Sequence, residues 1–442
     1  MLIIQGHRVV LPAGERPASI HIDNGIVVEV RAHGDVGSAS EIVNADPFVI
    51  LPGLVDSHVH VNEPGRTEWE GFDTATRAAA AGGITTIVDM PLNSIPSTTS
   101  VDALNAKRDA AHGQCHVDVA FWGGIVPGNH DHLEPLIDAG VRGFKCFMTP
   151  SGVDEFANVS ASDLRCALPI LARLPAPRPL LVHAEDPAFL RSPHGAPRAY
   201  ATFLATRPAD AEASAIRIIA RLADEYHVTA HIVHVSSAEG VEAIAAAQAA
   251  GTRLTAETCP HYLTFTASEI ADGATPFKCA PPIRSAEHRE ALWRALREGT
   301  CSLVASDHSP APGTMKREDS GDFLAAWGGI ASLELSLRAV WTEAVSRGFQ
   351  LTDLVRWMSE QPARLCGLDA RKGAIKPGAD ADLVLFDPDA RTTVIGSALM
   401  QRHKLTPYDG RLLRGAVRAT YVAGVNVWRD GTFVHTGRGR LL

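Results

Sequence analysis

The sequence of 442 residues has no excess of basic residues and no long apolar run. Its 50 Asp and Glu residues outnumber its 41 Lys and Arg residues, so the formal net charge is −9. Nucleic acids and anionic membrane surfaces both favour basic proteins, and we therefore expect neither as a partner. A membrane-spanning helix needs roughly 18 consecutive apolar residues, and no run here approaches that length.

Cysteine is also scarce, with 7 residues spread along the chain and no CxxC pair. This pattern favours free thiols in a reducing compartment, so we expect a cytoplasmic protein. Hydrophobic residues make up 45% and charged residues 21% of the chain, which is typical of a globular protein and excludes a disordered one.

The central part of the sequence alternates between short β-branched runs and helix-like segments. Eight such runs with helical spacers predict a parallel (β/α)8 barrel, an α/β fold of the TIM type. An open doubly wound sheet is the alternative, but no GxGxxG motif follows the first run. The strand-like runs are 50–61, 84–90, 117–122, 141–148, 180–184, 228–235, 252–257 and 302–307, and the helix-like segments include 71–81, 161–174, 209–226, 238–250, 286–298 and 330–347.

Both ends of the chain are expected to be β-structure. Near the N-terminus, Asn24-Gly25 separates two apolar runs, which is a strong signal for a hairpin, and the tail has a similar pair of runs around Gly424. Neither end is long enough to make a good core alone. We therefore expect residues 1–50 and 373–442 to form one small β-sandwich domain, with residues 51–372 as the catalytic barrel.

Candidate metal ligands stand at the ends of several predicted barrel strands. His58 and His60 alternate along the first run, so both side chains point to the same face, into the barrel mouth. A lone HxH pair is a weak signal, and each later residue taken alone could be an ordinary core or ion-pair residue. Together they predict a metal site at the mouth of the barrel, where barrel enzymes carry their chemistry. The later residues are Lys145, His183, His234 and Asp307.

This set of six residues on a barrel resembles the amidohydrolase superfamily, in its branch with two metal ions and a carboxylated lysine. The resemblance implies that His58, His60 and Asp307 bind the more buried ion, and that His183 and His234 bind the more exposed one. Lys145 would bridge both ions as N6-carboxylysine, a carbamate formed with carbon dioxide, because an ammonium has no lone pair for a metal. Nitrogen and carboxylate ligands suit Zn best in our expectation, with Co, Mn or Fe as alternatives.

Within the superfamily the motifs are most similar to those of the allantoinase family. That resemblance implies hydrolysis of the hydantoin ring amide of (S)-allantoin to allantoate by a hydroxide bridging the metal ions, with Asp307 as general base. The partner would be this small molecule, and a homotetramer is expected by analogy. The motifs are HVHVNEPGR (58–66), DMPLN (89–93), ETCPHY (257–262), KCAPPIR (278–284), SDHSP (306–310), AWGGI (326–330) and RHKLTPY (402–408).

Two enzyme alternatives and one non-enzyme alternative stay open. Dihydroorotases resemble this chain but carry an Arg two residues after HxH, where Asn62 stands here, and hydantoinases lack the Asn-Glu-Pro-Gly segment. A barrel that has lost its metals and serves as a scaffold is the third possibility. Candidate substrate contacts are Asn93, Ser309 and the backbone at Ala280. His231, three residues before His234, is expected to pack away from the site.

Overall fold

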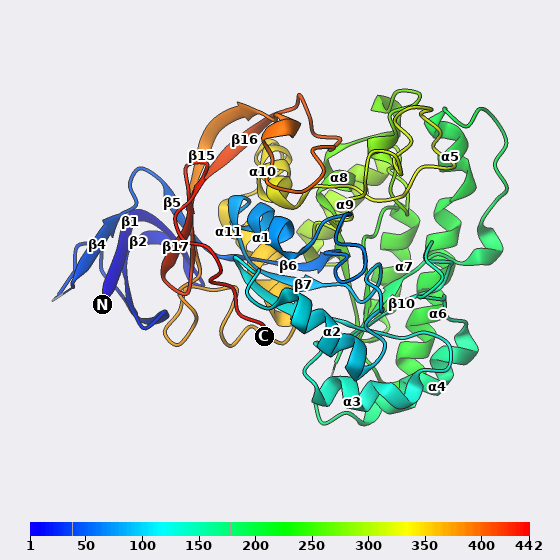
Figure 1. The fold of residues 1–442 in the computed structure, drawn as a ribbon, viewed down its shortest axis with the longest axis horizontal. Coiled ribbons are helices and arrows are strands. Elements are labelled where there is room, and N and C mark those ends of the chain that lie inside the picture. Colours follow the sequence, from blue (N-terminus) through cyan, green and yellow to red (C-terminus); the bar gives the residue numbers. More distant parts are fainter. Residues whose placement is uncertain (38, 177) are drawn as a thin grey trace.

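The computed structural model describes residues 1–37, 39–176 and 178–442. Eight parallel strands form a barrel, and the strands from the two chain ends form a separate sheet beside it (Figure 1). One residue separates strand β8 from β9, and together they count as one barrel strand. Strand β8 pairs with β7, and β9 pairs with β10. The barrel strands are β6 (Leu54–Val59), β7 (Ile84–Asp89), β8 (Asp118–Phe121) with β9 (Gly123–Gly124), β10 (Phe144–Phe147), β11 (Leu180–His183), β12 (Ala230–Ile232), β13 (Leu254–Thr258) and β14 (Leu303–Val304).

Closure of the barrel takes place just after β14. Val59 at the end of β6 forms a parallel bridge with His308, and the His60 amide donates to the His308 carbonyl at 2.8 Å. The amide of Ser306 also donates to the buried Asp56 carboxylate at 3.2 Å. These contacts join the last strand to the first, so the predicted barrel is confirmed.

The helices lie outside the barrel strands, as Figure 1 shows for α2, α4 and α6. Most predicted helices agree with the structure to within a few residues. The segment 330–347 differs, because Ile330 forms a bridge with His308 and only from Ser336 onward is the chain α-helical. The helices are α1 (Phe72–Ala81), α2 (Val101–Ala111), α3 (Leu133–Asp138), α4 (Ala161–Arg173), α5 (Tyr200–Thr206), α6 (Ala209–Tyr226), α7 (Ala238–Ala249), α8 (Pro260–Thr264), α9 (Ala286–Glu298), α10 (Ser336–Ser346), α11 (Leu351–Val355) and α12 (Gln361–Leu365), with a π-helical turn at Arg356–Glu360.

Strands from both ends of the chain join one nine-stranded sheet. Two-residue turns at Asn24-Gly25 and Ala423-Gly424 have positive φ at both positions, the geometry that the right-handed twist of hairpin strands favours. Strand β5 pairs with β1 on one side and with β15 on the other, which links the two ends. The strands are β1 (Leu2–Leu11), β2 (Gly14–Asp23), β3 (Ile26–Arg31), β4 (Glu41–Asn44), β5 (Val49–Pro52), β15 (Leu383–Thr393), β16 (Leu412–Val422), β17 (Val425–Arg429) and β18 (Thr432–Phe433).

The terminal sheet has an apolar core of its own that includes Ile4, Ile20, Ile50 and Leu385. Its other face shares the large core of the barrel through residues such as Val384 and Phe386. We propose on this basis the division into residues 1–50 with 373–442 and residues 51–372. Among the described residues, no helix is both long enough and apolar enough to cross a membrane.

A buried ion cluster fastens the chain end to the barrel. The Lys372 ammonium lies 2.6 Å from Asp118 and Asp382 and 2.9 Å from Asp380, and all four side chains are buried. Arg440 donates to Asp118 and Asp380 from the C-terminal segment, whose Leu442 amide bonds to Val119 of β8. Arg371 donates to Asp380 as well, so the charges of three buried carboxylates depend on one lysine and two arginines.

Replacing Lys372 by Met should lower the free energy of unfolding by about 3 kcal/mol or more, because buried carboxylates would lose their main counter-charge. Denaturant titration of the purified variant measures this loss. Arg165→Met, which breaks the exposed Arg165–Glu225 pair, is the matched control and should cost less than about 1 kcal/mol. A Lys372→Met loss as small as that of the control would contradict the role assigned to the cluster.

Candidate metal centre

The six predicted ligands lie at or just beyond the carboxyl ends of barrel strands, where a closed parallel barrel brings them together. His58 is on β6 and His60 follows its last residue, while Lys145 and His183 are on β10 and β11. His234 stands two residues after β12 and Asp307 three residues after β14. All six side chains are buried.

One group of three gathers around Asp307. The Nε2 atoms of His58 and His60 lie 3.1 Å and 3.4 Å from the Asp307 Oδ1 atom. One ligand atom from each residue lies within 4.8 Å of the others, close enough to hold one ion. Asp307 has a φ of 45°, a left-handed conformation that is uncommon outside glycine and that turns its carboxylate toward the two histidines.

The other two histidines form a pair beside this group. The Nδ1 atom of His183 lies 3.0 Å from the Nε2 atom of His234, and the His58 and His234 rings are 5.5 Å apart. Burial and the neighbouring positive groups hold the pKa of His234 well below its usual range. Both rings therefore favour the neutral form, which is the form that binds a metal.

Lys145 is fully buried, and its Nζ atom has no hydrogen-bond partner among the described residues. The centroid of the Phe147 ring lies 5.0 Å from Nζ. Burial lowers the pKa of Lys145 to about 8, although the charges of Asp307 and Glu257 oppose this shift. An unpaired buried ammonium is costly, so the structure disfavours ordinary protonated lysine at this position.

Two buried carboxylates orient the histidines from behind. The Nδ1 atom of His58 lies 2.5 Å from Glu257, and the Nε2 atom of His183 lies 2.7 Å from Glu185. Each carboxylate can accept the N–H of one ring nitrogen, so that His58 Nε2 and His183 Nδ1 would offer their lone pairs to a bound ion. Against the effect of burial, the charges of Asp307 and Glu257 raise the pKa of His58 to about 9, so binding of an ion at Nε2 would displace a proton. Despite its burial, the pKa of Glu185 is lowered to about 2, by Arg207 and His183.

Sequence reasoning missed this outer layer of residues. His231 is buried and does not line the cavity, as expected, but its Nε2 atom lies 3.0 Å from Glu257, so it shares that carboxylate with His58. Arg207 likewise donates to Glu185, the carboxylate behind His183. The signals available were the HAE sequence at 183–185 and Glu257 at the start of the ETCPHY motif.

Cys259 and His261 also have ligand atoms within 4.8 Å of Asp307. Burial raises the pKa of the Cys259 thiol well above its usual range, which disfavours the thiolate that a metal would need. The His261 ring nitrogens have no partner in the described part of the chain. This second group shares Asp307 with the histidine group, so the two are alternatives for one ion.

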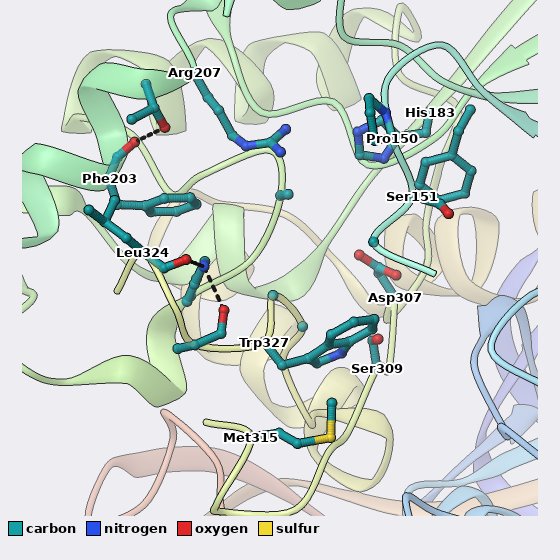
Figure 2. A pocket seen from close by; sticks show the side chains of 18 of the residues that line it. Pro150, Ser151, His183, Phe203, Arg207, Asp307, Ser309, Met315, Leu324 and Trp327 are labelled. Atoms are coloured by element: carbon teal, nitrogen blue, oxygen red, sulfur yellow. Dashed lines mark hydrogen bonds between the residues drawn. The ribbon is translucent and has the colours of Figure 1, made fainter. Parts of the chain in front are cut away.

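A cavity of about 880 Å³ opens above the candidate ligands. The four predicted histidines and Asp307 line it, as do Asn93, Ala280 and Ser309, the predicted substrate contacts. Figure 2 shows His183, Arg207, Asp307 and Ser309 around the same space. Asn93 also reaches the site, since its Nδ2 atom lies 3.4 Å from His60 Nδ1. Asn62, two residues after His60, is buried and is not among the residues that line the cavity.

Comparison with known proteins agrees with this arrangement. The model of the amidohydrolase family matches residues 49–427, and the chain belongs to that family. It is 49% identical to an allantoinase of Streptomyces avermitilis, over 100% of this chain and 98% of that protein, and 43% identical to an allantoinase of Arabidopsis thaliana, over 99% and 90%. Among solved structures, an L-hydantoinase of Arthrobacter aurescens superposes with a TM-score of 0.94 at 34% identity, covering 100% of this chain and 99% of that one.

Replacing Glu257 by Gln should weaken divalent-metal binding about 10- to 100-fold, because His58 loses the charged acceptor that fixes its tautomer. The measurement is metal content after dialysis against a series of chelator concentrations. Glu287→Gln, at an exposed position on α9, is the control and should retain metal like the unchanged protein. Equal retention by both variants would refute the orienting role of Glu257.

Proposed function

We propose that this enzyme opens the hydantoin ring of allantoin by hydrolysing a ring amide bond, giving allantoate. The observation that carries this proposal is the 49% identity to an allantoinase over 100% of the chain. The structure supplies a cavity with candidate metal ligands at its base, as such a reaction requires. Water adds to the ring carbonyl carbon, the ring C–N bond breaks, and the product carries a carboxylate and a free ureido nitrogen.

The residues present fit a pair of divalent ions. His58, His60 and Asp307 would hold one ion, and His183 and His234 the other. The buried, unpartnered Nζ atom of Lys145 fits a carbamate, whose two oxygens would bridge both ions. When bound, the ions supply Lewis acidity that lowers the pKa of water to about 7 and polarises the ring carbonyl.

The protein's own residues position the substrate and move the proton. Asp307 lines the cavity and accepts a proton from water at a carboxylate oxygen, then returns it to the departing ring nitrogen. This transfer matters because an unprotonated amide nitrogen is a poor leaving group. Asn93, Ala280 and Ser309 line the cavity and would contact the ring and the ureido chain of the substrate.

The proposal includes three finer points. Zinc is the metal we favour for this ligand set, with cobalt, manganese and iron as outcomes of a metal analysis. The oligomer is a homotetramer by resemblance to related enzymes. The location is cytoplasmic, in keeping with seven cysteines that are all free.

A substrate panel tests the proposed reaction. Protein reconstituted with divalent metal and bicarbonate should convert allantoin to allantoate at least about 100-fold faster, in kcat/KM, than it hydrolyses dihydroorotate or 5-substituted hydantoins. Chromatography of each reaction mixture measures the products. Preferred turnover of a hydantoin would assign the chain a hydantoinase activity instead, and metal-loaded protein inactive on every ring would exclude the proposal.

Replacing Lys145 by Ala should remove the bridge between the ions and lower activity by more than about 1,000-fold, while the fold stays intact. Metal content, circular dichroism and allantoin turnover are measured together. Adding acetate or propionate should restore part of the activity, because a free carboxylate can occupy the vacated space. Full activity without any added acid would rule out the carbamate.

A further inference from the structure

Two lysines outside the candidate metal centre are buried without a carboxylate partner. Lys278 is 9% exposed and Lys316 is 4% exposed. Among the described residues, neither forms an ion pair with an acidic side chain, and the hydrogen bonds of both go to backbone carbonyls. Asp322 and Glu318 act on them only through weak, longer-range attraction. Buried lysines are normally paired, so these two need another explanation.

Both ammonium groups bind backbone carbonyls of one short segment. Lys316 donates to the carbonyls of Trp327, at 3.1 Å, and of Gly329. Lys278 donates to the carbonyls of Leu324, at 3.2 Å, and of Ala326, at 2.5 Å. Lys316 also donates to the carbonyl of Lys278 itself, at 3.2 Å, which joins the two lysines. The three donors of Lys316 are therefore matched by three acceptors.

The segment 324–329, which we call the wall, forms one side of the cavity. Figure 2 shows Trp327 beside Ser309 and Asp307. The Trp327 ring packs edge-on against Trp69, with centroids 4.9 Å apart. The wall overlaps the AWGGI motif (326–330), to which the proposed reaction gives no role.

The wall is also tied closely to the segment that carries Asp307. The Gly329 amide donates to the Lys278 carbonyl at 2.8 Å, and Gly329 has a φ of 154°. A Cβ atom at this position would lie 2.3 Å from the Ser309 carbonyl oxygen, so only glycine allows this approach. A shift of the wall would therefore change the distance between its surface and Asp307.

Carbonyls of an irregular segment cannot be satisfied by strand pairing, so buried ones need donors from elsewhere. Here four carbonyls of the wall receive them from two lysine side chains. Burial lowers the pKa of Lys316 to about 7, and the surrounding carbonyl oxygens favour its ammonium form. Removal of either amine would leave wall carbonyls without donors.

We propose that Lys278 and Lys316 are positioning residues that hold the wall against the Asp307 segment, so that the ring substrate meets a preformed surface. This proposal rests on the proposed function, because the effect is read on substrate binding. If the substrate must first order the wall, part of its binding free energy is lost in the ground state and in the transition state alike. The loss raises KM and leaves kcat nearly unchanged.

The test compares Lys316→Met with Lys316→Arg and with Lys376→Met, all reconstituted with metal. Lys376 is the matched control because it is only half-buried and donates to the single carbonyl of Asp369, away from the wall. We expect Lys316→Met to raise KM for allantoin at least about 10-fold, with kcat within about threefold and metal content unchanged. Lys316→Arg should recover part of the KM, and Lys376→Met should match the unchanged protein.

Tryptic cleavage after Arg317, an exposed residue next to Lys316, gives a reading that does not depend on any substrate. Cleavage should be at least about 10-fold faster in Lys316→Met, because the segment before Arg317, whose Met315 carbonyl accepts from the Trp327 amide, would loosen together with the wall. Lys278→Gln, which keeps amide donors, is the milder variant if Lys316→Met does not fold, and should show smaller changes in the same direction. Unchanged KM and cleavage in a folded variant, or loss of metal with a fall in kcat, would overturn the proposal.

If the unchanged protein fails to hydrolyse allantoin, the proposed function fails, and the cleavage rates still decide whether the lysines hold the wall.

Discussion

The bridge between Val59 and His308 closes the barrel, and the geometry of the candidate metal centre depends on that closure. Through it the last strand is held beside the first, so that Asp307 reaches both His58 and His60 with a single oxygen atom. The remaining ligands come from strands between these two. A small shift at the closure would separate Asp307 from His58 and His60.

Behind the candidate metal-binding histidines lies a second set of buried charged and polar side chains. Glu257 and Glu185 carry negative charge behind the histidines, and His231 and Arg207 satisfy those carboxylates in turn. Each buried charge near the metal centre therefore has a partner, with the exception of Lys145 among the six predicted ligands. That exception is understandable if the lysine is a carbamate whose partners are metal ions, because its buried charge would then be paired.

Sequence alone could predict the barrel and the inner ligands, since strand periodicity and strand-end positions are local properties. Asn24-Gly25 likewise predicted its hairpin from two residues. The links of Glu257 to His58 and of Glu185 to Arg207 could not be predicted, because they span 199 and 22 residues and depend on how strands are rotated in the barrel. The same holds for Lys316, whose carbonyl acceptors lie on an irregular segment with no periodic signal. The start of α10 at Ser336 was missed because a bridge to His308 holds Ile330 in extended form.

The carbamate bridge at Lys145 is tested most directly by carbon-13 NMR of protein reconstituted with zinc and 13C-labelled bicarbonate, combined with metal analysis of the same sample. We expect one protein-bound carbamate carbon and two metal ions per chain, and we expect the labelled carbon and the metal ions to be lost together in the Lys145→Ala variant. Two tightly bound ions with no labelled carbon would contradict this expectation, because Lys145 would then have no role as the bridge.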